Sequence, residues 1–285
     1  MLMAFAVIGL VNFLERGVDE SLAAEKKFRA HLLLRSARTL AGHPDLERGD
    51  PLLRQAISAV SSYEITLSSE GTRLAINQIA ADPRQRFFAQ RLFVKWGMDA
   101  TQAQTLADSI IDWIDPNDRP RPQGAEKDYY QAQGQSGHPF DRPFQDINDL
   151  LLVRGADVMD KLKGNWRDYF TIYGDGTIDM QLAQSELLEA LFDVTGNEVS
   201  RLIRGRLGPD GLADTEDDHT FAAMPEVRAL LDVPQQNYNR VLPLLTLKHP
   251  IQRVECLARV GTLERRLTVL TGPGLKLVRE ENVVP

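Results

Sequence analysis

Residues 112–130 read DWIDPNDRPRPQGAEKDYY and place several oxygen-bearing side chains in a stretch that proline and glycine keep out of regular secondary structure. Such a concentration of acids has three ordinary explanations: a helix end in water, a general acid and base of an enzyme, or a cage for a hard cation. Neither histidine nor cysteine occurs in this stretch, so its donor set suits calcium better than zinc. The candidate ligands are Asp115, Asn117, Asp118 and Glu126.

The spacing of these residues matches an EF-hand calcium loop only in part. With Asp115 as the first position, Asn117 is the third and Glu126 the twelfth, and all three have suitable oxygen chemistry. Arg119 and Pro120 then occupy the fifth and sixth positions, where the loop needs another ligand and a glycine. We therefore exclude an EF-hand and expect a proline-stiffened loop that takes its remaining oxygens from elsewhere.

A second acidic loop, GPDGLADTEDD at 208–218, concentrates five more carboxylates among turn-forming glycines and a proline. Carboxylates this close together repel one another unless water screens them or a cation neutralises them. We expect calcium here as well, with a solvated loop as the alternative. The candidate ligands are Asp210, Asp214, Glu216, Asp217 and Asp218.

Catalytic explanations find less support in the sequence. Asp112 and Asp115 lie one helical turn apart, as a general acid and base could, but nothing marks a substrate pocket beside them. The stretch GQSGH at 134–138 lacks the second glycine of a nucleophile elbow. Cys256 alternates with apolar neighbours, as a core residue would. We predict that the protein is not an enzyme and has no catalytic residue.

The overall composition is that of a globular protein with an acidic balance of charge. The 285 residues are 43% apolar and 26% charged, with a formal net charge of -7. Nucleic-acid affinity depends on clustered Lys and Arg, so this balance argues against a nucleic-acid partner. The segment DINDLLLVRGADVMDKL at 146–162 nevertheless looks like a helix-hairpin-helix unit, which keeps a nucleic-acid-binding protein as the alternative function.

The N-terminal residues are expected to form one long helix. Residues 1–14, MLMAFAVIGLVNFL, carry no charge but are too few to cross a bilayer, which takes roughly 20 apolar residues. We interpret them as the lower half of a membrane helix, with a buried helix start as the alternative. Apolar residues continue at helical spacing as far as Ala37, and Gly42 with Pro44 marks the end.

Strand patterns lie on both sides of a long helical block. A short helix is expected at 56–60, residues 61–77 alternate like a hairpin around Glu70 and Gly71, and four segments after Asn239 alternate like an antiparallel meander. A lone hairpin is marginally stable, so we expect the early strands to pair with the late ones in one α+β fold. The expected parts are 1–41 as an N-terminal helix, 42–80 with 236–285 as a discontinuous α+β domain, and 81–235 as an all-helical insertion carrying both acidic loops.

Several motifs resemble the K-type minor pseudopilin family of the type II secretion system, also called general secretion pathway protein K. They are LADSIIDWIDPND at 106–118, PQGAEKDYY at 122–130, FQDINDLLLVRG at 144–155 and GTIDMQLAQSELLEAL at 176–191. The first motif is the most distinctive. In the last one, Asp179 and Gln181 stand where the family pattern has asparagines.

The resemblance implies a pilin-like fold, in which a long N-terminal helix packs on an antiparallel sheet that carries a large helical insertion. It implies a non-catalytic structural component at the tip of the secretion pseudopilus, with the I-type and J-type minor pseudopilins as partners. It places one membrane helix in the bacterial inner membrane and the bulk of the chain in the periplasm. It also implies calcium in the insertion, bound through Asp115, Asp118 and Glu126.

Overall fold

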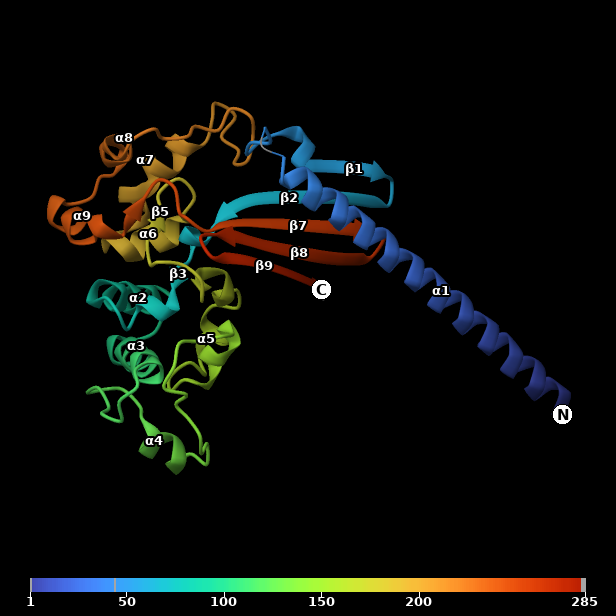
Figure 1. The fold of residues 1–285 in the computed structure, drawn as a ribbon, viewed down its shortest axis with the longest axis horizontal. Coiled ribbons are helices and arrows are strands. Elements are labelled where there is room, and N and C mark those ends of the chain that lie inside the picture. The colour runs from blue at the N-terminus through green and yellow to red at the C-terminus, as the bar shows by residue number, and fades with distance from the viewer. Residues whose placement is uncertain (1, 44, 283–285) are drawn as a thin grey trace. The chain divides into compact units, whose positions relative to one another are not determined.

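The structure, a computed structural model, describes residues 2–43 and 45–282, and the chain divides into two units (Figure 1). The sheet unit comprises Met1–Leu67, Asp214–Glu216 and Arg253–Pro285, and the helical unit comprises Ser68–Ala213 and Asp217–Gln252. Each unit has its own hydrophobic core. Residues 68–80 and 236–252, which we expected in the α+β domain, lie in the helical unit because buried side chains such as Ile76 and Leu244 pack in its core.

The sheet unit joins one long helix to one five-stranded sheet. Helix α1 (Leu2–Ala41) buries Ala30, Leu34 and Ala37, which recur at helical spacing on one face and pack in one core with sheet residues. The strand order is β1-β2-β7-β8-β9, and Figure 1 shows neighbouring strands running in opposite directions. The position of β2 beside β7 confirms the expected pairing of early with late strands. The strands are β1 Arg54–Ser58, β2 Ser61–Ser69, β7 Gln252–Val260, β8 Leu263–Gly272 and β9 Leu275–Asn282.

Two local predictions near the first strands are wrong. Residues 56–60 do not form a helix, because β1 covers Arg54–Ser58 and pairs with β2 as an antiparallel hairpin. The expected partner of β2, Leu74–Ala75, is β3 and pairs in parallel with β4 (Phe170–Thr171) of the helical unit. Alternating side chains show that a segment is extended, but they do not show which strand lies beside it.

The helical unit is helical apart from two short strand pairs. Strand β3 pairs with β4, and β5 (Ile178–Asp179) pairs with β6 (Leu245–Thr246), both in parallel, so the insertion is not all-helical as expected. The fully buried rings of Phe93, Trp113 and Trp166 lie in its core. The helices are α2 Pro83–Lys95, α3 Ala100–Ile114, α4 Lys127–Ala132, α5 Met159–Leu162, α6 Ser185–Phe192, α7 Gly196–Arg206, α8 Met224–Leu230 and α9 Gln235–Val241.

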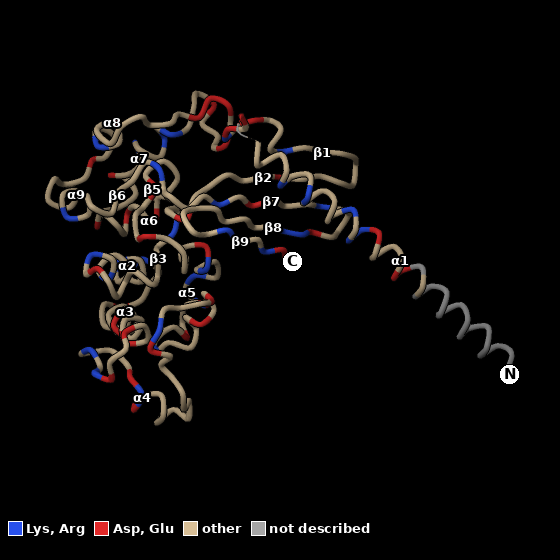
Figure 2. The backbone as a smooth tube through the Cα atoms, viewed as in Figure 1, with Lys and Arg blue, Asp and Glu red and all other residues tan. Residues whose placement is uncertain are grey.

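The segment 146–162 does not form the two α-helices of a helix-hairpin-helix unit. Ile147–Leu152 is a 3-10 helix, and α5 is a single helical turn. Along the described backbone, Lys and Arg are interspersed with Asp and Glu (Figure 2). Neither observation supports a surface that binds nucleic acid.

The prediction for the apolar start of α1 depends on side chains that lie outside the described part of the structure. The backbone of α1 is helical over its length, but the side chains of residues 2–16 and 18 are not described. Within the described residues, none of the helices combines the length and the apolar composition that crossing a membrane requires.

Candidate functional site

Glu126 is a buried carboxylate whose oxygens lack hydrogen-bond donors. It lies directly before α4, at the N-cap position, but its side chain makes no capping bond there. The residue is 4% exposed, and neither Oε1 nor Oε2 has a hydrogen-bond partner among the described residues. An isolated charge in such surroundings is unfavourable, so this carboxylate needs either a proton or a cation.

The negative charges of four aspartates act on the carboxylate of Glu126. Burial and then the charges of Asp112, Asp115, Asp141 and Asp118 raise the pKa of Glu126 from 4.5 to about 7. Asp112 is fully buried on α3, and Asp141 lies in the loop after α4 with a positive φ of 51°. These five side chains, Asp112, Asp115, Asp118, Glu126 and Asp141, are called the acidic cluster below.

Two cationic side chains form ion pairs with the acidic cluster in the described part of the chain. Arg121 Nη1 lies 2.9 Å from Asp112 Oδ1 and 2.6 Å from Asp115 Oδ2. Lys127 Nζ lies 2.6 Å from Asp118 Oδ1 and 3.2 Å from Asp141 Oδ2. Five carboxylates therefore share two cations, and the deficit of positive charge falls on Glu126.

Helix α3 places the buried acid of the cluster. The helix begins at a capping box in which Asp99 accepts the amide of Gln102 and the Gln102 side chain accepts the amide of Asp99. Its last turns bury Asp112 and Trp113 together. The chain turns back so closely after the helix that a Cβ on Gly124 would lie 1.8 Å from Asp112 Oδ2. Glycine at 124 is thus required for space, because it lets the loop backbone approach a buried carboxylate.

The structure brings together only some of the predicted ligands of the first loop. Asp115, Asp118 and Glu126 belong to the acidic cluster. Asn117 is exposed, and its side-chain oxygen already accepts the amide of Arg119 at 2.9 Å. Its side-chain nitrogen donates to Asp115 Oδ1. Because of these bonds, the loop is a succession of local turns, and its side chains do not follow the ligand positions of an EF-hand.

Two members of the acidic cluster were not predicted as ligands. Asp112 is one helical turn before Asp115, and its place on the apolar side of a helical pattern was a signal that could have found it. Asp141 carries no such signal. It reaches the cluster through the fold of the loop after α4, which no sequence spacing records.

The second acidic loop uses several of its carboxylates in local bonds. Asp214 Oδ1 accepts from Arg48 Nη2 at 2.6 Å within the sheet unit. Asp210 Oδ1 accepts the amide of Leu212 at 2.7 Å, and Asp217 Oδ2 accepts the amide of Asp210 at 3.1 Å. The loop is therefore held by its own turns and by an arginine, and the calcium expected at Asp210, Asp214, Glu216, Asp217 and Asp218 stays a prediction.

The donor set of the acidic cluster fits a calcium ion better than other metals. All of its ligands would be carboxylate oxygens, which calcium accepts with variable coordination geometry. Both carboxylate oxygens of Glu126 lack a hydrogen-bond partner among the described residues. In the described residues, no group of three or more His, Cys, Asp or Glu side chains already stands in position to hold a metal ion. Binding would therefore require the carboxylates to turn toward a common point.

Asp112, the buried aspartate of the acidic cluster, is poorly suited to acid–base catalysis. Asp112 is fully buried, and the backbone amide of Arg121 donates to its Oδ2 at 3.0 Å while the guanidinium holds Oδ1. A general acid or base must come within hydrogen-bond reach of a substrate. A carboxylate enclosed in this way cannot do so, so the pairing of Asp112 with Asp115 serves the fold of the loop.

Without a bound cation, Glu126 is expected to make the chain less stable as pH rises. The folded state binds the proton more tightly than the unfolded state, because the pKa is raised from 4.5 to about 7. This contribution to stability is complete below 4.5 and is lost as pH rises through about 7. The melting temperature in EDTA should therefore fall between about pH 5 and about pH 8. Glu126→Gln should fall less over that interval, and an equal fall in both proteins would contradict the assignment.

The fold defines the class of protein to which the chain is similar: a pilin-like α+β unit with a large helical insertion. It matches, with a TM-score of 0.67 and 16% identity, a chain in the crystal structure of the GspK-GspI-GspJ complex from the enterotoxigenic Escherichia coli type 2 secretion system. The match covers 93% of this chain and 100% of that chain. The similarity confirms the predicted fold class.

The family model of type II secretion system protein K matches residues 67–163. The type II secretion system protein K of Klebsiella pneumoniae is 30% identical over 144 residues, which are 46% of this chain and 44% of that protein. The protein K of Dickeya chrysanthemi is 26% identical over 48% of this chain and 39% of its own length. The matched region is thus less than half of each relative's length. The resemblance to this family that the motifs predicted is confirmed.

Proposed function

We propose that the chain is a minor pseudopilin at the tip of the type II secretion pseudopilus, where it serves as a non-catalytic structural component of protein export. The observation that carries this proposal is the fold match over 93% of the chain, which includes both the sheet unit and the insertion. The family match, which begins at the end of β2 and continues into the helical unit, supports the same conclusion.

The I-type and J-type minor pseudopilins are the proposed partners. Support comes from the surface of α1, where Leu22, Phe28 and Leu32 are 49%, 62% and 43% exposed. Large apolar side chains repeated on an exposed helix face are typical of a surface that packs against another helix. We further propose that the start of α1 anchors the subunit in the bacterial inner membrane as a single span, with the remaining chain in the periplasm.

We also propose that the acidic cluster binds calcium. Asp115, Asp118 and Glu126 are ligands from the sequence prediction, Asp112 and Asp141 are added on the structure, and Asn117 would contribute only after releasing Arg119. A bound divalent cation would supply the positive charge that Arg121 and Lys127 leave incomplete. The role of these side chains is to order a loop rich in proline and glycine, since binding that favours the folded state stabilises it. The second loop remains a further candidate calcium site.

The proposed assembly can be tested by producing the full chain together with the I-type and J-type minor pseudopilins of the same bacterium. A stable complex of the three proteins is the expected result. Phe28→Glu should abolish it, because a carboxylate would replace a ring that is 62% exposed on α1. Leu242→Glu, at a side chain that is 45% exposed in the helical unit, is the matched control and should leave the complex intact. Separate elution of the three unaltered proteins would contradict the proposal.

A further inference from the structure

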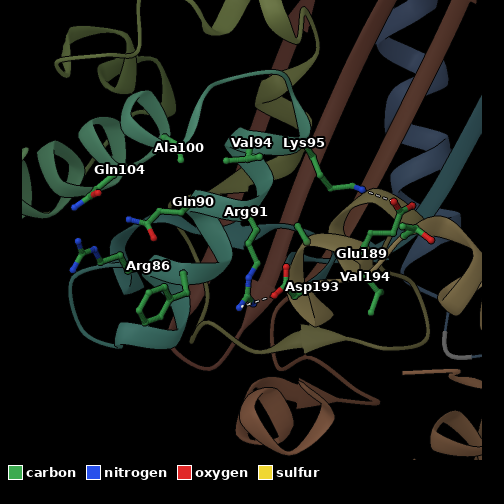
Figure 3. A pocket seen from close by; sticks show the side chains of 14 residues that line it. Arg86, Gln90, Arg91, Val94, Lys95, Ala100, Gln104, Glu189, Asp193 and Val194 are labelled. Carbon is green, nitrogen blue, oxygen red and sulfur yellow. Dashed lines mark ion pairs between the residues drawn. The ribbon is translucent and has the colours of Figure 1, made fainter. Parts of the chain in front are cut away.

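A groove on the helical unit lies between helix α2, the start of α3 and the end of α6 (Figure 3). Its volume is about 750 Å³, which is within the range of ligand-binding pockets. Arg91 and Lys95 reach from α2 across the groove toward Asp193 and Glu189 (Figure 3). The groove shares no lining residue with the acidic cluster.

Two large apolar side chains of the groove are exposed on α2. Phe87 is 52% exposed and Val94 is 46% exposed. They are two helical turns apart and therefore lie on the same face of the helix. The same helix buries Phe88, Leu92 and Phe93 on its other side, so the exposed pair is not needed to attach α2 to the core. Exposed apolar side chains beside a groove are typical of a surface that binds another molecule.

The three cations of the groove differ in how closely they are paired. Arg86 Nη2 lies 2.6 Å from Asp108, which is fully buried, and Lys95 Nζ lies 2.5 Å from Glu189. Arg91 has longer contacts, at 3.4 Å from Asp193 Oδ2 and 3.5 Å from the carbonyl oxygen of Leu191. Arg91 is therefore the cation with the weakest pairing in the groove.

The surroundings of Arg91 favour an additional anion. Its side chain is 22% exposed, whereas that of Asp193 is 55% exposed and partly screened by water. Burial, opposed in part by Asp193, lowers the pKa of the Arg91 guanidinium, and the nearby charge of Arg240 acts in the same direction as burial. A carboxylate held in plane with this guanidinium would form two charge-assisted hydrogen bonds at closer range than the present contacts.

We propose that this groove docks a segment of a partner polypeptide in which one carboxylate lies between large apolar side chains. The carboxylate binds Arg91, and the apolar side chains cover Phe87 and Val94. Charge complementarity carries the choice of occupant, because Arg86 and Lys95 are already closely paired and Arg91, with the longest ion pair of the three, is the cation best placed to bind a further carboxylate. Two exposed apolar side chains lie in the same groove. A small inorganic anion would leave the apolar pair exposed, and a wholly apolar segment would leave Arg91 without a close partner. The proposal does not depend on the proposed function.

The test uses the full 285-residue chain and two fluorescein-labelled peptides. One peptide has a single aspartate between pairs of leucines, and the other has asparagine in its place. Fluorescence anisotropy should show the aspartate peptide binding at least about tenfold more tightly, since a charge-assisted pair is worth roughly one such factor. Arg91→Gln should remove this preference, and Arg91→Lys should keep part of it. Phe87→Ser should weaken both peptides.

The matched control is Arg201→Gln, at an exposed arginine of α7, which should leave the preference unchanged. The melting temperature of each variant shows that it is folded under the conditions of binding. Failure of both peptides to bind, equal affinity for the two peptides, or an equal loss in Arg91→Gln and Arg201→Gln would overturn the proposal. Binding of labelled decanoate but of neither peptide would assign the groove to an amphiphile and overturn it as well.

Discussion

Wild type and Glu126→Gln are expected to exchange their order of stability when calcium is added: the variant should be the more stable protein without calcium, and wild type the more stable protein with it. At about pH 8 in EDTA the wild-type carboxylate is charged, buried and without a donor, so Glu126→Gln should melt at the higher temperature. A rise in pKa from 4.5 to about 7 corresponds to a difference on the order of 3 kcal/mol. At calcium concentrations about 100-fold above the dissociation constant, wild type should gain roughly 3 kcal/mol and the variant much less.

Calcium titrations followed by thermal unfolding measure both halves of this crossover. Glu20→Gln, at an exposed acid of α1, is the matched control and should behave like wild type with and without calcium. Magnesium provides a second control, because it demands octahedral geometry and gives up its water reluctantly. The same melting temperature in EDTA and in millimolar calcium would contradict the calcium proposal. A calcium response retained in full by Glu126→Gln would show that the ion binds away from the acidic cluster.

Local signals in the sequence were sufficient to predict where helices α2 and α3 begin. Asp82 before Pro83 and the capping box of Asp99 mark the starts of α2 and α3, and the structure has both. The run after Ser185 reads as one helical pattern, but it is interrupted at Asp193, which adopts φ 60°. The break also has a local signature, a second capping box between Thr195 and Glu198, so a closer reading could have found it.

The sequence predicted that early strands pair with late ones, but it did not predict every partner. The alternating pattern after Ser61 correctly predicted strand β2. Its hairpin partner is β1, which precedes it in the chain, whereas the expected partner β3 pairs with β4. The role of Asp141 was likewise not predictable from the sequence. Its ion pair with Lys127 depends on the path of a loop, and that path is set by packing around Trp113. A loop carboxylate carries no periodicity, and its environment therefore becomes visible only when the fold is known.

Gly124→Ala is expected to destabilise the protein and to remove its calcium response. The new Cβ would lie 1.8 Å from Asp112 Oδ2, so either the loop or the carboxylate must move. Asp112 is fully buried and bonded to Arg121, and breaking a buried ion pair of this kind costs about 3 kcal/mol or more. Urea unfolding should show this loss. Gly164→Ala is the control, because a Cβ there meets nothing within 4 Å, and it should change stability little.

A double-mutant cycle with Asp112→Ala separates the collision from a general effect of alanine in the loop. If the loss in Gly124→Ala arises from the carboxylate, shortening residue 112 removes the obstacle, and Gly124→Ala should then cost little in the Asp112→Ala background. The two changes should thus be strongly non-additive, whereas Gly164→Ala and Asp112→Ala should add. Additive losses for the first pair would show that the loss in Gly124→Ala does not arise from the space beside Asp112.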